Sequence, residues 1–250
     1  MALLRLVLVA LLAAGLPSGD SREPVLVRSP GDGVELLTYS YGTLGLGRIH
    51  VLRFSPDAVD LRYLFPPAGT TLSQVLAMPG CSEALACVNG SFFEAESDRP
   101  IGLIVSEGKV VQRLKRTSWG VFWLDRKGRA HVTGPRAFRR EVDVDKDIQF
   151  AIQSTPMLIV DGKERKASDV RKARRTVLGA DSTGRLLILV FPFPIAHSEV
   201  AQFARSRLLA VQLMNLDGGS STQLSVAGDA APLVPGVVVA DGIGLFRKGK

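Results

Sequence analysis

The sequence predicts an α+β fold: a single strand-dominated domain with a mixed or antiparallel sheet, several hairpins and two or three helices. Short apolar runs separated by turn residues follow one another from Val34 onward, which is typical of strands joined by tight turns. Helix signals are few: residues 71–78 are bounded by cap and stop residues, and residues 198–209 have apolar residues at helical spacing. No low-complexity linker interrupts residues 34–250, so we expect one domain there.

Four pairs of apolar runs flank short polar turns and predict hairpins. Three of the turns contain a glycine, which readily adopts the left-handed backbone that tight turns need. The predicted strand pairs are residues 51–54 with 59–65, 101–105 with 109–112, 120–124 with 129–132, and 176–180 with 185–191.

Two helices are expected from the spacing of apolar residues. The first, over residues 71–78, is bounded by a threonine that can cap it and by a Pro-Gly stop. The second, over residues 198–209, has Ser198 as its cap candidate and leads into a buried strand at residues 210–216. Its apolar face comprises Val200, Phe203, Ala204 and Leu208.

The N-terminal residues 1–19 have the layout of a secretory signal peptide. A positive charge at Arg5 precedes an apolar run over residues 6–14, and small residues follow. Residues 20–33 are polar and contain Pro and Gly, so we expect an arm or a loop there. The mature protein is therefore expected to be exported, periplasmic or secreted, with no membrane span after signal removal.

The composition narrows the classes of partner. Hydrophobic residues make up 46% of the chain, which supports a packed core. The formal net charge of +7 favours an acidic partner, whereas an aromatic content of 6% is low for a protein that stacks nucleic-acid bases. We therefore expect an anionic substrate and no nucleic-acid partner.

The cysteines and histidines indicate a disulfide rather than a metal centre. Cys81 and Cys87 are separated by five residues and can pair locally in an oxidising compartment. Two thiols with no histidine at metal-ligand spacing make a poor metal site. We expect no cofactor, although an oxygen-ligated divalent metal leaves no motif and stays open.

Familiar catalytic motifs are absent from the sequence. It contains no phosphate-binding P-loop, no GxGxxG after a strand, no HExxH and no GxSxG. The three scattered histidines leave a Ser-His-Asp triad open without pointing to one.

Two turn segments are candidate parts of a site. Residues 87–94 form an apolar strand that ends in Asn-Gly and is followed by two phenylalanines, which fits either core anchors or a ligand wall. In residues 215–222 a buried strand delivers Asp217 to its end, and Gly218 and Gly219 allow the backbone to approach a ligand. An ordinary Asp-Gly turn between strands has the same pattern.

A basic run is the third candidate. Residues 163–175 contain seven Lys and Arg against Glu164 and Asp169, and most such runs are solvated loops. Arg175 differs from the others because it stands where the loop enters a strand, so its side chain can be held rigidly.

Five landmark segments occur together in one order along the chain. They read VNGSFF (88–93), IGLIVSEGK (101–109), QSTPML with DGK (153–163), RRTVLG (174–179) and LDGGSST (216–222). In these segments the chain resembles the phosphodiester glycosidase family, over nearly all of residues 51–246. The resemblance implies cleavage of the anomeric C–O bond of a sugar-1-phosphodiester, with an N-acetylglucosamine-like sugar. The products are a free sugar and a phosphomonoester.

The chain departs from the family pattern at three places. Ser91 stands where a glycine is usual, residues 191–194 replace a shorter connection, and Asp241 begins a segment that usually reads Asn-Ala-Ile. These departures bear on substrate choice more than on fold.

The resemblance also implies roles for particular residues. Asp217 is the candidate nucleophile or water-activating base, Arg175 the partner of the phosphate, and Asn89 the group that orients the sugar or the water. The predicted substrate-binding residues are Gly90, Phe92, Phe93, Glu94, Ser154, Thr176, Gly218, Gly219, Ser220, Ser221 and Thr222. Glu94 and Asp181 are alternative carboxylates, and Asp181 fits a hairpin turn better.

Two other functions remain open at this stage. The chain is either an enzyme or a non-catalytic module of the same fold that binds an anionic cell-envelope glycan, because the positive charge suits both. A phosphodiesterase that cuts the P–O bond ranks last, since such chemistry usually recruits metal ions through several carboxylates or histidines.

Overall fold

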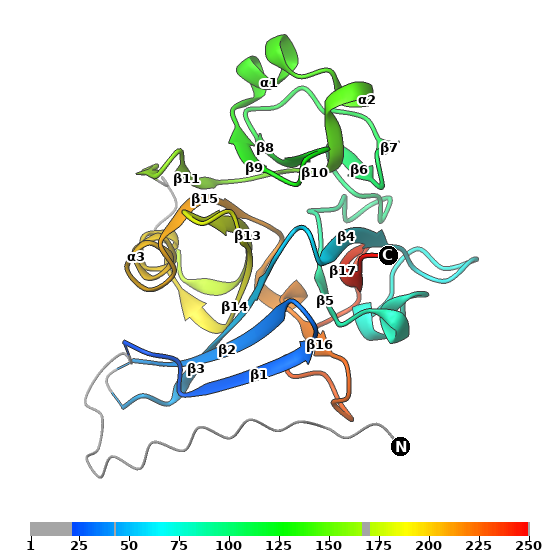
Figure 1. The fold of residues 1–250 in the computed structure, drawn as a ribbon. Coiled ribbons are helices and arrows are strands. Elements are labelled where there is room, and N and C mark those ends of the chain that lie inside the picture. Colours follow the sequence, from blue (N-terminus) through cyan, green and yellow to red (C-terminus); the bar gives the residue numbers. More distant parts are fainter. Residues whose placement is uncertain (1–21, 43, 167–170, 250) are drawn as a thin grey trace.

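The computed structural model describes residues 22–42, 44–166 and 171–249, and its strands form three sheets (Figure 1). The largest sheet has eight strands in the order β1-β2-β3-β14-β13-β15-β11-β12. These strands are β1 (Leu26–Gly31), β2 (Val34–Tyr41), β3 (Gly47–Phe54), β11 (Met157–Val160), β12 (Lys163–Glu164), β13 (Ala173–Asp181), β14 (Leu186–Ile195) and β15 (Ala210–Asn215). The signal peptide predicted for residues 1–19 lies outside the described residues.

Two smaller sheets lie on one side of the large one. The five-stranded sheet contains β7 (Lys109–Gln112), β6 (Ile104–Ser106), β10 (Ile148–Ser154), β8 (Gly120–Asp125) and β9 (Ala130–Thr133). The four-stranded sheet contains β16 (Leu224–Val226), β5 (Ala86–Asn89), β17 (Gly242–Arg247) and β4 (Val59–Leu64). All strand pairs in the described part of the chain are antiparallel, so the fold class predicted from the sequence is confirmed.

The helices are short apart from one. They are α1 (Pro135–Glu141), α2 (Val144–Asp147) and α3 (His197–Leu208), with single 3-10 turns η1 (Val75–Ala77), η2 (Cys81–Glu83) and η3 (Gly219–Ser221). In Figure 1, α1 and α2 lie on the five-stranded sheet and α3 lies beside β13 and β15. No helix in the described residues is long and apolar enough to cross a membrane.

The two faces of the large sheet belong to different cores. Leu178 of β13 packs in a core shared with the two smaller sheets, whereas its neighbour Val177 packs against α3. This alternation follows from the two-residue period of a strand. Side chains on consecutive residues of β13 therefore enter different environments, which decides the role of its arginines.

Most of the local predictions are confirmed. β6 pairs with β7, β8 with β9, and β13 with β14, as the turn glycines indicated. Helix α3 matches the predicted second helix, but Ala196 rather than Ser198 is its N-cap. The reason is that Glu199 accepts a hydrogen bond from the Ala196 N–H, which starts the helix one residue earlier.

The predicted hairpin of residues 51–65 is wrong. β3 pairs with β2 and β14 in the large sheet, whereas β4 pairs with β17 in the four-stranded sheet. The turn after Phe54 moves the chain from one sheet to another. Two adjacent apolar strands look the same in sequence whether they pair with each other or with distant partners.

The other two corrections concern residues 71–78 and 20–33. The expected first helix is only the turn η1, because Ser73 is held in an extended bridge with Val239 by two backbone hydrogen bonds of 3.0 and 2.9 Å. The expected arm contains β1, which pairs with β2 at the edge of the large sheet. The apolar side chains around β1 are exposed, so no alternation marked it as a strand.

Candidate active site

Asp217 lies immediately after β15, an inner strand of the large sheet. Its Oδ1 accepts a hydrogen bond of 2.7 Å from the Gly218 N–H, and Ser221 donates a side-chain hydrogen bond to the carboxylate. Burial raises the pKa of Asp217 above its usual value, and the two hydrogen bonds oppose that shift. A carboxylate has about four acceptor positions, so further positions remain for a ligand.

Asn89 is the buried centre of the network that holds Asp217. Its Nδ2 donates a hydrogen bond of 2.8 Å to the backbone oxygen of Asp217. Its Oδ1 accepts hydrogen bonds from Thr176 Oγ1 at 2.6 Å and from the Gln223 N–H at 3.2 Å. Asn89 is fully buried, so the predicted contact with sugar or water does not fit this placement. Its amide instead fixes three chain segments relative to one another.

Gly90 joins Asp217 to a second carboxyl group, that of Asp241. The Asp217 N–H donates to the backbone oxygen of Gly90 at 3.3 Å, and the Gly90 N–H donates to the backbone oxygen of Asp241 at 3.2 Å. A Cβ atom at position 90 would overlap Asp241 Oδ1. Only glycine fits between these two segments, which explains the Gly90 of the VNGSFF landmark.

Asp241 is buried and bonded to Ser91. The Ser91 N–H donates to Oδ1 at 2.7 Å, and Ser91 Oγ is hydrogen-bonded to Oδ2. Burial raises the pKa of Asp241 to about 7, the bonds from Ser91 lower it, and the charge of Asp217 raises it. Asp241 therefore keeps its proton at pH values where Asp217 is ionised. The sequence marked Ser91 and Asp241 only as separate departures, and the structure brings them into contact.

The two neighbouring arginines of β13 point to opposite faces of the sheet. Arg175 is buried opposite Phe191 on the α3 side, where its guanidinium donates to the backbone oxygens of Arg171 and Ile195 at 2.6 and 3.4 Å. Thr176, which bonds Asn89, faces the other way. The predicted role of Arg175 as phosphate partner does not fit this placement.

Arg174 is the arginine on the same face as Thr176. Its Nη2 donates to the backbone oxygens of Thr222 and Pro235 at 2.5 and 2.7 Å, and so ties β13 to the turn after Asp217. Its Nε is buried and has no hydrogen-bond partner within the described residues. Gly218 lies against this strand, because a Cβ there would be 2.8 Å from the Arg174 oxygen.

The turn after Asp217 offers backbone donors. Ser221 and Thr222 donate their N–H groups back to Gly218 and Gly219, which closes η3. The N–H groups of Gly219 and Ser220 have no partner in the described part of the chain, and Ser220 is exposed. Two adjacent donors beside a carboxylate are suited to the oxygens of a phosphate group.

Aromatic side chains meet where the segment after β5 contacts the segment before β8. Phe92 is half-buried and contacts Trp119, with ring centroids 5.3 Å apart, whereas Phe93 packs into the core around η1. Trp119 carried no signal in the sequence, because it precedes a strand far from residues 87–94.

The remaining predicted residues have mainly structural environments. Exposed Glu94 pairs with Lys115 at 2.9 Å, and this hydrogen bond lowers its pKa. Buried Ser154 donates to the Asn215 oxygen at 2.6 Å. Asp181 accepts the N–H groups of Thr183 and Arg185, as expected for its hairpin turn. No group of three or more His, Cys, Asp or Glu that could hold a metal ion is present among the described residues.

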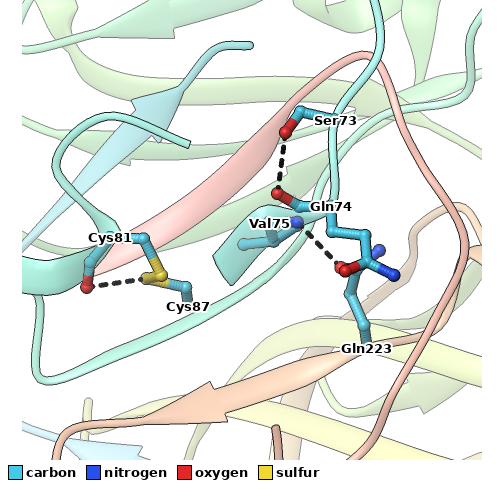
Figure 2. The surroundings of a disulfide bond; sticks show 6 residues. All are labelled: Ser73, Gln74, Val75, Cys81, Cys87 and Gln223. Carbon is cyan, nitrogen blue, oxygen red and sulfur yellow. Dashed lines mark hydrogen bonds between the residues drawn. A yellow bond between two sulfur atoms is a disulfide. The ribbon is translucent and has the colours of Figure 1, made fainter. Parts of the chain in front are cut away.

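The predicted disulfide is confirmed: it joins Cys81, the first residue of η2, to Cys87 in β5 (Figure 2). The same view shows the Gln223 side chain reaching across to η1, where its Oε1 accepts a hydrogen bond of 2.8 Å from the Val75 N–H. Gln223 also bonds Asn89 through its own N–H. The segment before β5 is thus pinned both by the disulfide and by the strand that follows the Asp217 turn.

Comparison with known proteins shows the family of the chain. Residues 82–246 match the family model of the phosphodiester glycosidases (NAGPA), which covers most of the chain. The protein belongs to the phosphodiester glycosidase family. The uncharacterized protein YigE of Escherichia coli (strain K12) is 30% identical over 152 residues, which are 58% of this chain and 59% of that relative's length.

Three solved structures share the fold of this family member. The zebrafish N-acetylglucosamine-1-phosphodiester α-N-acetylglucosaminidase catalytic domain, auto-inhibited by its pro-peptide, superposes with a TM-score of 0.68 at 16% identity, covering 92% of this chain and 88% of the other. A hypothetical protein from Synechocystis gives 0.63 at 16% identity, covering 90% and 64%. A putative exported protein from Burkholderia pseudomallei K96243 gives 0.59 at 14% identity, covering 83% and 75%.

Proposed function

We propose that this protein is an exported hydrolase that cleaves the anomeric C–O bond of a sugar-1-phosphodiester. The products are the free sugar and a phosphomonoester. The observation that carries the proposal is Asp217 at a strand end of a phosphodiester glycosidase domain, with its backbone oxygen bonded to Asn89 and its carboxylate to the Gly218 N–H. The zebrafish relative is named as an N-acetylglucosaminidase, so N-acetylglucosamine is the first sugar to test.

Asp217 acts at the anomeric carbon. Its carboxylate either attacks that carbon or takes a proton from the water that attacks it, while the C–O bond breaks and its electron pair leaves with the phosphate oxygen. The second pKa of a phosphomonoester is about 6, so the leaving group needs less protonation than an alcohol does. The network around Asn89 keeps the carboxylate in position.

The turn after Asp217 binds the departing phosphate. The N–H groups of Gly219 and Ser220 donate to its oxygens, and the guanidinium of Arg174 supplies positive charge beside the turn. The pair of Phe92 and Trp119 provides an apolar surface for the sugar.

Export is supported by two observations. The Cys81–Cys87 disulfide is typical of an oxidising compartment, and one protein of the same fold is described as a putative exported protein.

The test is hydrolysis of the methyl diester of N-acetylglucosamine-1-phosphate, and of UDP-N-acetylglucosamine, in ¹⁸O-labelled water. We expect the label in the sugar, and a loss of about a thousandfold or more in kcat for Asp217→Asn. Asp229→Asn, which removes a surface carboxylate paired with Arg28, is the matched control and should keep full activity. Label in the phosphate, or an active Asp217→Asn variant, would reject the proposal.

A further inference from the structure

Two adjoining cavities lie between the five-stranded sheet and β11. The first, of about 470 Å³, is lined by Thr155, Pro156 and Arg165 among others. The second, of about 770 Å³, extends it past α1 and shares Ser118, Gly134 and Arg165 with it. Together they exceed the few hundred Å³ that a small ligand occupies. We call this continuous depression the basic groove.

The charge of the basic groove has one sign. Arg116, Arg136, Arg139 and Arg165 line it, Lys166 extends it, and no carboxylate is among its lining residues. All four arginines are exposed, and their guanidinium groups form no ion pair or hydrogen bond with the described residues. Several arginines outside the groove are paired with carboxylates: Arg28 with Asp229, Arg53 with Glu35 and Arg129 with Asp125.

The basic groove begins beside the candidate active site. The backbone oxygens of Thr155 and Pro156, which line the groove, accept hydrogen bonds from Asn215 at 3.0 and 3.1 Å. Asn215 stands two residues before Asp217, which is about 7 Å along a strand. Ser118, which also lines the groove, is followed in the chain by Trp119, and the Trp119 ring contacts Phe92.

We propose that the basic groove binds the further phosphates of a substrate that continues past the cleaved bond, so that the substrate is a glycan carrying several phosphodiesters. A single diester carries one charge, and the turn after Asp217 already provides donors for it. Unpaired guanidinium groups beyond that point match successive phosphates, which they bind through two N–H groups at once. This inference takes the identity of the cleaved bond from the proposed function.

A nucleic acid fits the basic groove less well than a phosphoglycan. No aromatic side chain is among the lining residues, so bases have no ring on which to stack. Sugars joined by phosphodiesters need only the spaced charges and polar backbone that the groove presents.

The test compares a tetramer of N-acetylglucosamine joined by 1→6 phosphodiesters with the methyl diester of N-acetylglucosamine-1-phosphate. Binding is measured by calorimetry in the Asp217→Asn background, and hydrolysis in the wild-type background. The groove variant combines Arg116→Ala, Arg136→Ala and Arg139→Ala. The control variant combines Lys109→Ala, Lys127→Ala and Arg140→Ala, which removes the same charge at exposed positions outside the groove.

We expect the tetramer to bind at least about tenfold more tightly than the single unit, and the groove variant to lose that advantage. The control variant should keep it, and both should hydrolyse the single unit like the wild type. Raising the salt concentration should weaken tetramer binding more in the wild type than in the groove variant.

Three results would overturn the inference: equal affinity for tetramer and single unit, equal losses in the groove and control variants, or a 20-nucleotide DNA strand that binds as tightly as the tetramer. Tetramer binding that depends on the groove, without hydrolysis of either probe, would support the groove and reject the proposed function. The two proposals can therefore fail separately.

Discussion

Polar side chains around Asp217 and in the basic groove differ in burial and in hydrogen bonding. Around Asp217, the side chains of Asn89, Thr176 and Gln223 are buried and bonded within the chain. In the groove, four arginines are exposed and unpaired within the described residues. Buried networks fix geometry, because breaking them leaves unsatisfied groups. Exposed charges without a partner are not fixed by the protein, so the comparison separates a rigid candidate active site from an adaptable charged surface.

The largest effect is expected for Asn89→Ala, which removes the centre of the buried network around Asp217. It leaves the Thr176 hydroxyl and the Asp217 oxygen without their partner and opens a cavity, so we expect a loss of about 3 kcal/mol in the free energy of unfolding. We also expect kcat to fall about a hundredfold in the folded variant. Denaturant unfolding and steady-state kinetics measure both. Thr176→Val, which removes one of these bonds, should cost only about 1 kcal/mol. Full activity in Asn89→Ala would contradict the positioning role.

The next largest effects are expected for the two arginines of β13, which lie on opposite faces of the sheet. Arg174→Ala should raise KM for a sugar-phosphodiester about tenfold, because it removes positive charge beside the turn after Asp217. Arg175→Ala should instead lower the melting temperature and leave KM unchanged in the folded protein, because Arg175 lies on the α3 side. The assignment is wrong if the Arg175 variant shows the larger change in KM.

A smaller effect concerns Asp241, whose pKa of about 7 lies above that of an unfolded carboxyl group. The folded protein keeps a proton that the unfolded chain releases. The free energy of unfolding therefore falls as pH rises from about 4 to about 7, and is level above that. Asp241→Asn should remove this fall, because an amide can keep both contacts with Ser91.

Activity gives a second measure of Asp241. The groups facing it are Ser91, the Asp217 carboxylate and the buried Tyr63, so its ionisation adds a second negative charge beside Asp217. We expect kcat/KM for an anionic substrate to fall a few-fold above pH 7, and less so in Asp241→Asn. Parallel pH profiles of the two proteins would refute this.

The smallest expected effect is on the stability of groove variants. Arg136→Ala and Arg139→Ala remove exposed side chains without a partner, so each should change the free energy of unfolding by less than about 0.5 kcal/mol. Thermal melts in low salt measure this. A large loss would mean that these arginines have a structural role and would weaken the contrast.

Local features of the sequence were the predictable ones. The turn glycines placed three hairpins, and apolar spacing placed α3. The landmark segments also placed Asp217 correctly at a strand end followed by glycines, because this is a local pattern, and its catalytic role stays a prediction.

Features that depend on distant partners could not be predicted in the same way. Choosing between Arg174 and Arg175 required the face of β13, and a shift of one residue reverses that face. Asp241 lies 150 residues from Ser91 in the chain, so neither residue alone indicated the pair. The sheet change after Phe54 likewise depends on β17, which is the last strand.

The position of β17 in the chain also determines when the candidate active site can form. This last strand lies between β4 and β5, and Asp241 immediately precedes it. A chain synthesised or translocated only as far as residue 240 lacks the inner strand beside β5, and with it the support of Asn89. The candidate active site therefore forms only when the C-terminal residues have emerged. Under the proposed export, amino end first, the candidate active site would assemble only after residues 241–247 have crossed the membrane.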